Sequence, residues 1–131
     1  MGICLGLQLL FETSDETPGV QGLGILKGKI KRILDNGELK IPHIGWNSLS
    51  FPNKGRLYEG IPQERYVYFV HSYYLDAEDK DIVVATTEYG TTIHASVEQG
   101  NVFACQFHPE KSSSVGLKIL DNFLKISKED K

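Results

Sequence analysis

Apolar and polar positions divide the chain into a short helical start, a series of strands and a closing helix. Residues 7–12 are mainly apolar and compatible with a helix, and residues 13–24 are rich in Ser, Thr, Asp and Gly, which is typical of a turn-rich surface connection. Residues 112–114 are three serines that can cap a final helix. We expect the apolar stripe of that helix to contain Leu117, Leu120, Phe123 and Leu124.

The middle of the chain is patterned as strands. The runs rich in β-branched and aromatic side chains are residues 25–34, 65–74, 82–89, 93–98 and 102–107. A turn signal at residues 35–37 predicts that the first strand folds back into residues 39–44, and the short spacing of the last three strands predicts an antiparallel meander. Since the second run has no polar face, we expect it to be a central strand.

The single Trp lies in a segment that we expect to be a loop. Pro42 and Gly45 flank it closely and disfavour regular structure over residues 42–47. A Trp in a loop is a common binding anchor, but it can equally fold back over its own core. The sequence leaves both interpretations of Trp46 open. Residues 57–60 are compatible with one helical turn.

Length, charge and cysteine content restrict the class of protein. A chain of 131 residues and 14.7 kDa predicts one domain with a substantial core. A net charge of −3 gives no electrostatic signature for binding nucleic acid, and no apolar run approaches the ~20 residues that span a membrane. Two cysteines are too few for a disulfide framework. We therefore expect a cytoplasmic protein that binds neither nucleic acid nor membrane.

Cys4 is the first candidate for chemistry. It lies between Gly2 and Gly6, directly before the apolar run, and small residues at these spacings allow a sharp strand-to-helix turn called a nucleophile elbow. Such a turn would hold the sulfur at a helix N-terminus, where the thiolate is favoured. The alternative is an apolar core cysteine, because free Cys is among the most buried residue types.

A second candidate follows the last strand. In an extended segment residues two apart point the same way, so Glu110 can accept the Nδ1 proton of His108, and Pro109 keeps the segment extended. A His oriented by a carboxylate has the form of a general base. The alternative is a surface His beside an exposed Glu. Cys105 points to the opposite face of the strand and is expected to be a core thiol, which leaves Cys4 as the partner of this His.

The two motifs together resemble class I glutamine amidotransferases, in which Cys, His and Glu form a triad. The segments 42–47, 68–74 and 110–113 are similar to the glutaminase subunit of imidazole glycerol phosphate synthase, from histidine biosynthesis. The resemblance covers essentially the whole chain. It implies an α/β fold, namely the three-layer flavodoxin-like amidotransferase domain with an antiparallel extension.

The resemblance also implies roles for individual residues. Cys4 is the nucleophile that forms a thioester with glutamine, His108 the general base and acid, and Glu110 the group that orients His108. The implied substrate-binding residues are Leu5 through its backbone N–H, Gln8, Ser72 and Tyr73. The implied contacts with the cyclase (synthase) subunit, which receives the ammonia, are Trp46, Tyr68 and Lys111. We expect no metal and no cofactor. Alternatively, Gln8 is a solvated helix residue, and Ser72 and Tyr73 merely end a strand.

The chain departs from the family at its beginning. Family members carry parallel strands and a glycine-rich loop before the elbow, and that loop supplies the second oxyanion donor, whereas here Met1 directly precedes Gly2. We therefore expect residues 1–131 to be the C-terminal part of an amidotransferase domain, with N-terminal strands missing and catalysis impaired. The alternatives are a defective fragment or binding module that keeps the partner surface, or the glutaminase of another class I amidotransferase pathway.

Overall fold

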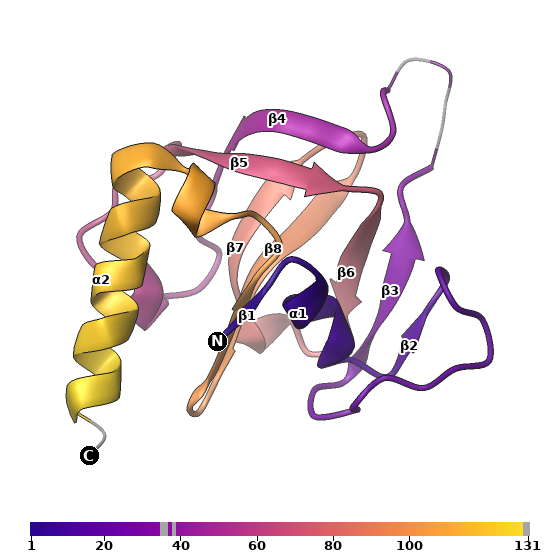
Figure 1. Cartoon of the computed structure of the whole chain (residues 1–131), viewed down its shortest axis with the longest axis horizontal. Coiled ribbons are helices and arrows are strands. Elements are labelled where there is room, and N and C mark those ends of the chain that lie inside the picture. The colour runs from indigo at the N-terminus through magenta and orange to yellow at the C-terminus, as the bar shows by residue number, and fades with distance from the viewer. Residues whose placement is uncertain (35–36, 38, 130–131) are drawn as a thin grey trace.

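The computed structural model describes residues 1–34, 37 and 39–129, and strands make up most of its regular structure (Figure 1). The strands are β1 (Gly2–Ile3), β2 (Thr13–Ser14), β3 (Gly28–Arg32), β4 (His43–Ser48), β5 (Tyr66–His71), β6 (Tyr73–Ala77), β7 (Val83–Glu88), β8 (Thr92–Gln99) and β9 (Val102–Cys105). The helices are α1 (Leu5–Leu9) and α2 (Ser113–Glu129), and single 3-10 turns are η1 (Arg56–Tyr58), η2 (Lys80–Ile82) and η3 (Pro109–Lys111).

The central sheet has four strands in the order β1-β9-β8-β7. Strand β8 is antiparallel to both β7 and β9, which confirms the expected meander. Strand β1 runs parallel to β9, with Gly2 opposite Ala104 and Ile3 opposite Cys105. This parallel pair brings the first residues of the chain beside residues 104 and 105.

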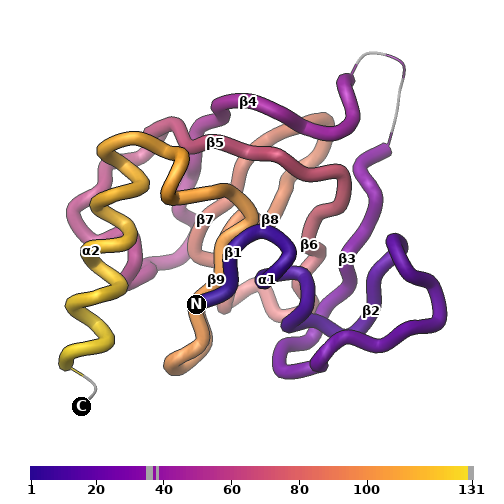
Figure 2. Tube along the Cα trace, in the orientation of Figure 1, coloured from indigo at the N-terminus to yellow at the C-terminus, as the bar shows by residue number. Residues whose placement is uncertain are grey.

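Two smaller sheets flank the central one. Strand β3 pairs in parallel with β2 and antiparallel with β6, and β4 pairs antiparallel with β5. Just beyond β4, Ser50 forms an isolated bridge with Thr86 of strand β7 in the central sheet. The chain thus forms the three sheets that Figure 2 follows along the Cα trace.

The central sheet buries both of its faces, as alternation along β9 makes clear. Phe103 and Cys105 pack with α2, β5 and η1 in one core cluster, whereas Ala104 packs with α1, β3 and β6 in the other. Alternate side chains of β9 therefore point to opposite faces of the sheet and pack into two different cores. The result is a mixed α/β arrangement in three layers, and the expected fold class is confirmed.

Two local predictions around the Trp are wrong. Residues 43–48 form strand β4, with six residues opposite β5, rather than an irregular loop. Gly45 supplies the positive φ of 139° that this strand adopts at its centre. Strand β3 pairs with β6 and not with residues 39–44, so the expected hairpin does not form; its turn residues 35 and 36 lie outside the described residues.

The apolar run 65–74 is two strands rather than one central strand. It breaks at Ser72, so that β5 pairs with β4 in one layer and β6 pairs with β3 in another. The Ser72 carbonyl accepts a hydrogen bond from the backbone N–H of Ile33 at 2.9 Å. An unbroken apolar pattern could not reveal this change of layer, because apolar and aromatic side chains run through both strands.

The stripe predicted for the closing helix is also partly wrong. The buried residues of α2 are Gly116, Ile119, Asn122 and Ile126, while Leu117 and Leu124 are 66% and 57% exposed. A Cβ at Gly116 would collide with the Pro109 carbonyl oxygen, so the helix docks closely through this glycine. The docking rotates the buried face away from the leucines.

Among the described residues, none of the helices has the length and apolar character that a membrane span needs.

Candidate active site

Cys4 adopts the strained backbone that a nucleophile elbow requires. Its φ is 54° and its ψ is −107°, between strand β1 and helix α1. Non-glycine residues avoid this region, and such strain occurs often at functional sites. A Cβ at Gly2 would lie 2.8 Å from the Gly6 carbonyl, so Gly2 permits the turn as predicted. A Cβ at Gly6 would meet no heavy atom of the described residues within 4 Å, so the close approach involves only the first glycine.

The Cys4 sulfur is half-buried and surrounded by polar groups. Its Sγ lies 3.5 Å from the Gln106 Nε2 and 3.7 Å from the Val70 carbonyl oxygen. Burial raises the pKa of the Cys4 thiol, and the Glu110 carboxylate raises it further, whereas the Leu5 N–H and the Gln106 amide lower it. The expectation of a favoured thiolate is therefore wrong in net direction, because desolvation outweighs the hydrogen bonds from the Leu5 N–H and the Gln106 amide.

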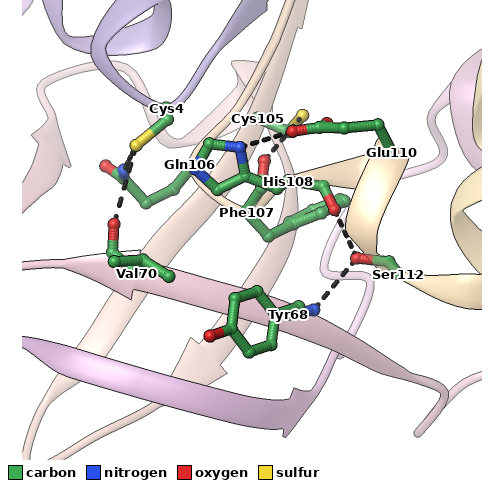
Figure 3. Close-up of polar contacts among 9 residues, drawn as sticks. All are labelled: Cys4, Tyr68, Val70, Cys105, Gln106, Phe107, His108, Glu110 and Ser112. Atoms are coloured by element: carbon green, nitrogen blue, oxygen red, sulfur yellow. Dashed lines mark hydrogen bonds and ion pairs between the residues drawn. The ribbon is translucent and has the colours of Figure 1, made fainter.

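His108 and Glu110 form the predicted pair. The His108 Nδ1 donates to the Glu110 Oε1 at 2.6 Å, although Pro109–Lys111 forms a 3-10 turn rather than an extended segment. The two side chains are 23% and 48% exposed. Figure 3 shows the imidazole between Glu110 and the Cys4 side chain. A neutral His with Nδ1–H bonded to a carboxylate keeps its Nε2 lone pair available as a base.

The backbone of His108 is fixed to strand β5. Its N–H donates to the Tyr68 carbonyl at 3.0 Å, and its carbonyl accepts from the Ser112 hydroxyl at 2.6 Å. The same hydroxyl accepts from the Tyr68 N–H at 3.0 Å, so Ser112 closes a ring of three hydrogen bonds, of which Figure 3 shows the two that its hydroxyl makes. Because Val70 on the same strand contacts the Cys4 sulfur, β5 supports both halves of the candidate site.

Gln8 is not a solvated helix residue. Its Nε2 donates to the Tyr73 carbonyl at 3.2 Å and to the Gln106 Oε1 at 3.0 Å. The structure therefore brings Gln8 and Tyr73 together beside Cys4, and Leu5 follows Cys4 at the start of α1. Ser72 is next to Tyr73, at the point where β5 gives way to β6.

The comparisons with known proteins agree with this geometry. Residues 1–126 match the family described as glutamine amidotransferase class-I. The chain belongs to the class I glutamine amidotransferases. Its 131 residues span about three fifths of the length of the curated relatives that they match.

Several relatives of this amidotransferase chain are named imidazole glycerol phosphate synthase subunit HisH. The relative from Moorella thermoacetica is 51% identical over 123 residues, which is 94% of this chain and 58% of the relative. The one from Bacillus subtilis is 50% identical over 135 residues, covering 100% of this chain and 63% of the relative. The one from Caldanaerobacter subterraneus is 54% identical over 123 residues, covering 94% and 60%.

Solved structures show the same fold at lower identity. A putative GMP synthase protein from Thermoplasma acidophilum is 21% identical with a TM-score of 0.67, covering 98% of this chain and 56% of that one. A glutamine amidotransferase from Thermotoga maritima is 19% identical with a TM-score of 0.60, covering 98% and 48%. These likenesses support the α/β amidotransferase fold.

The predicted partner residues of the amidotransferase chain lie at its surface. Trp46 is 49% exposed and is not a core residue; its ring meets that of Tyr68 edge to face, with centroids 5.8 Å apart. Lys111 is exposed at the end of η3, and its N–H donates to the His108 carbonyl. Tyr68 and Lys111 therefore bond the backbone of His108 directly, and Trp46 packs against Tyr68 from strand β4.

Sequence reasoning assigned no role to three polar residues of the amidotransferase chain. Gln106 is fully buried beside the nucleophile, and the only signal for it is a polar residue in an apolar run. His43 and His71 are also buried, with their Nδ1 and Nε2 atoms 3.0 Å apart. Burial lowers the pKa of His43 to about 4 and also lowers the pKa of His71, so both are neutral at pH 7. Their pairing depends on strand register, which the sequence does not display.

Proposed function

We propose that this chain carries the glutaminase site of an imidazole glycerol phosphate synthase, releasing glutamate and ammonia from glutamine. The observation that carries the proposal is the strained elbow at Cys4, φ 54°, adjoining the 2.6 Å pair of His108 and Glu110. A strained thiol beside a carboxylate-oriented imidazole is the arrangement used for nucleophilic acyl transfer.

The chemistry proceeds through a thioester. His108 takes the thiol proton as the Cys4 sulfur attacks the side-chain amide carbon of glutamine, and the Leu5 N–H donates to the oxyanion. His108 then protonates the amide nitrogen, the C–N bond breaks and ammonia leaves. Water, deprotonated by His108, attacks the thioester; glutamate departs and the thiol is restored. Since burial raises the pKa of Cys4, transfer of its proton to His108 is required at neutral pH.

A small cavity next to α1 fits the amino-acid end of glutamine. It measures about 80 Å³, and its walls include Leu5, Gln8 and Glu16. Glu16 is the only ionised side chain among the described residues that line it. A carboxylate there attracts the α-ammonium group of glutamine, and Ser72 and Tyr73, near Gln8, hold the same amino-acid end.

The relatives named HisH support the proposed pathway and partner. Ammonia passes to the cyclase subunit, which makes imidazole glycerol phosphate in histidine biosynthesis. Trp46, Tyr68 and Lys111 contact that subunit. Both thiols are free, which suits the reducing cytoplasm, where histidine biosynthesis would take place.

The test of the chemistry uses the complete protein with its cyclase partner and saturating glutamine. Cys4→Ala should lower glutamate release by at least about 10³-fold, because the nucleophile is lost. Cys105→Ala is the matched control and should keep activity within about fivefold, since Cys105 only fills the core. Undiminished turnover in Cys4→Ala would sink the proposal.

The test of the partner surface uses Trp46→Ala. We expect partner affinity to fall by more than about tenfold, because aromatic anchors at interfaces commonly contribute over ~1–2 kcal/mol. Leu124→Ala removes an equally exposed apolar side chain on α2 and should leave affinity unchanged. Titration calorimetry measures both, with circular dichroism to check folding. Equal affinities in a folded Trp46→Ala protein would remove Trp46 from the interface.

A further inference from the structure

Gln106 is a polar side chain in a place where polar groups are costly. It is 0% exposed, directly after strand β9, and its backbone N–H donates to the Ala95 carbonyl at 2.8 Å. Both ends of its side-chain amide are used: Nε2 lies 3.5 Å from the Cys4 sulfur, and Oε1 accepts from Gln8. Burying an amide is tolerated only when such bonds are made.

The direction of these bonds is determined by a backbone carbonyl. The Tyr73 oxygen can only accept, so the Gln8 group 3.2 Å away must be its NH₂. The second hydrogen of that NH₂ points at Gln106, whose facing atom must then be Oε1. This leaves the NH₂ of Gln106 facing the sulfur. Flipping the amide of Gln106 would place its NH₂ against the NH₂ of Gln8. Flipping the amide of Gln8 would place its oxygen against the oxygens of Tyr73 and Gln106.

The Tyr73 carbonyl is itself held from a second side. It accepts from the His71 Nδ1 at 2.8 Å, and the His71 Nε2 is paired with the His43 Nδ1. The acceptor that orients both glutamines is thus fixed by a buried pair of histidines. Together these groups form one chain of hydrogen bonds that ends at the Cys4 sulfur.

We propose that Gln106 is a positioning residue for the nucleophile, which donates an oriented N–H to the Cys4 sulfur and holds Gln8 in register with it. The inference rests on the proposed function for its catalytic meaning. A donor that faces sulfur favours the thiolate over the thiol and restricts the rotation of the Cys4 side chain. It acts against the burial and the Glu110 charge, which both disfavour the thiolate.

Gln106→Met tests this role, because Met has a similar volume but cannot donate a hydrogen bond to the Cys4 sulfur or accept one from Gln8. The readout is the rate at which iodoacetamide alkylates Cys4 between pH 6 and 10, followed by mass spectrometry of the Cys4 peptide. We expect the midpoint of the pH profile to rise and the rate at pH 7.5 to fall about threefold to tenfold. With the cyclase partner and glutamine, kcat should fall and KM should rise, since Gln8 loses its neighbour.

Asn122→Leu is the control. Asn122 is another buried amide, which donates to the Leu57 and Glu59 carbonyls under α2, away from Cys4. It should leave the alkylation profile unchanged. An unchanged profile in folded Gln106→Met, or an equal shift in Asn122→Leu, would overturn the proposal.

A second variant covers the case in which Gln106→Met does not fold. Gln8→Met lies on the half-buried helix α1 and frees the Gln106 amide to rotate, so it should shift the profile in the same direction by a smaller amount. No shift would again overturn the inference. Alkylation needs no glutaminase activity, so the positioning role of Gln106 and the proposed function can fail separately. If the variants shift the alkylation profile but the unmodified protein does not turn over glutamine, only the proposed function is refuted.

Discussion

Cys4 directly follows strand β1, Cys105 ends the neighbouring strand β9, and the two thiols have opposite surroundings. The Cys4 N–H donates to the Cys105 carbonyl at 2.8 Å, yet Cys105 is fully buried under α2 while Cys4 is half-buried at the edge of the sheet. Burial raises the pKa of both thiols. Hydrogen bonds from the Leu5 N–H and the Gln106 amide lower the pKa of Cys4, whereas among the described residues no such hydrogen bond lowers the pKa of Cys105. The backbone turn, rather than the residue type, separates a reactive position from an inert one.

The largest difference that we expect between them is in reactivity. Iodoacetamide should alkylate Cys4 on the order of 100-fold faster than Cys105, because a buried thiol reacts only after local opening. The raised pKa of Cys4 predicts that its rate still increases with pH above pH 8. Peptide-level mass spectrometry of the folded chain measures both rates. Comparable rates would mean that the elbow does not expose Cys4.

The two glycines of the elbow should differ in stability effects. Gly2→Ala should lower the free energy of unfolding by about 1–3 kcal/mol, since its Cβ would collide with the Gly6 carbonyl. Gly6→Ala faces open space within α1 and should raise stability by up to about 1 kcal/mol through helix propensity. Urea denaturation compares them. A larger loss for Gly6→Ala would contradict this account of the turn.

The smallest expected effect is on stability and comes from backbone strain at the two cysteine positions. Cys4→Gly should be about 1 kcal/mol more stable than Cys4→Ala, because glycine accepts φ 54° without a Cβ penalty. At Cys105, inside a strand, the order should reverse, as glycine gains nothing there and loses packing. Thermal denaturation measures the stability of the four variants. If Gly and Ala rank in the same order at both positions, the backbone at Cys4 is not strained.

The parts of the fold that the sequence predicts are those with local patterns. The meander β7–β9 follows from apolar runs and turns. The spacing of two predicts the pair of His108 and Glu110, although a 3-10 turn rather than an extended segment brings the two side chains together. Strand β4 was missed because Gly45 and Pro42 normally indicate loops, whereas pairing with β5 overrides that preference. The role of Gln106 could not be predicted, since its partners are Cys4 and Gln8, and only the three-dimensional fold brings them together.

The hydrogen bond between Cys4 and Gln106 joins residues 102 positions apart, and that between Cys4 and Val70 joins residues 66 apart. A long stretch of chain must therefore close into a loop before the sulfur meets its neighbours. Contacts of such separation carry a large closure entropy and form late in folding. During synthesis the elbow leaves the ribosome well before residues 105–110, so its contacts with them cannot form until those residues have also emerged. The sulfur therefore acquires its Gln106 neighbour only when strand β9 is in place.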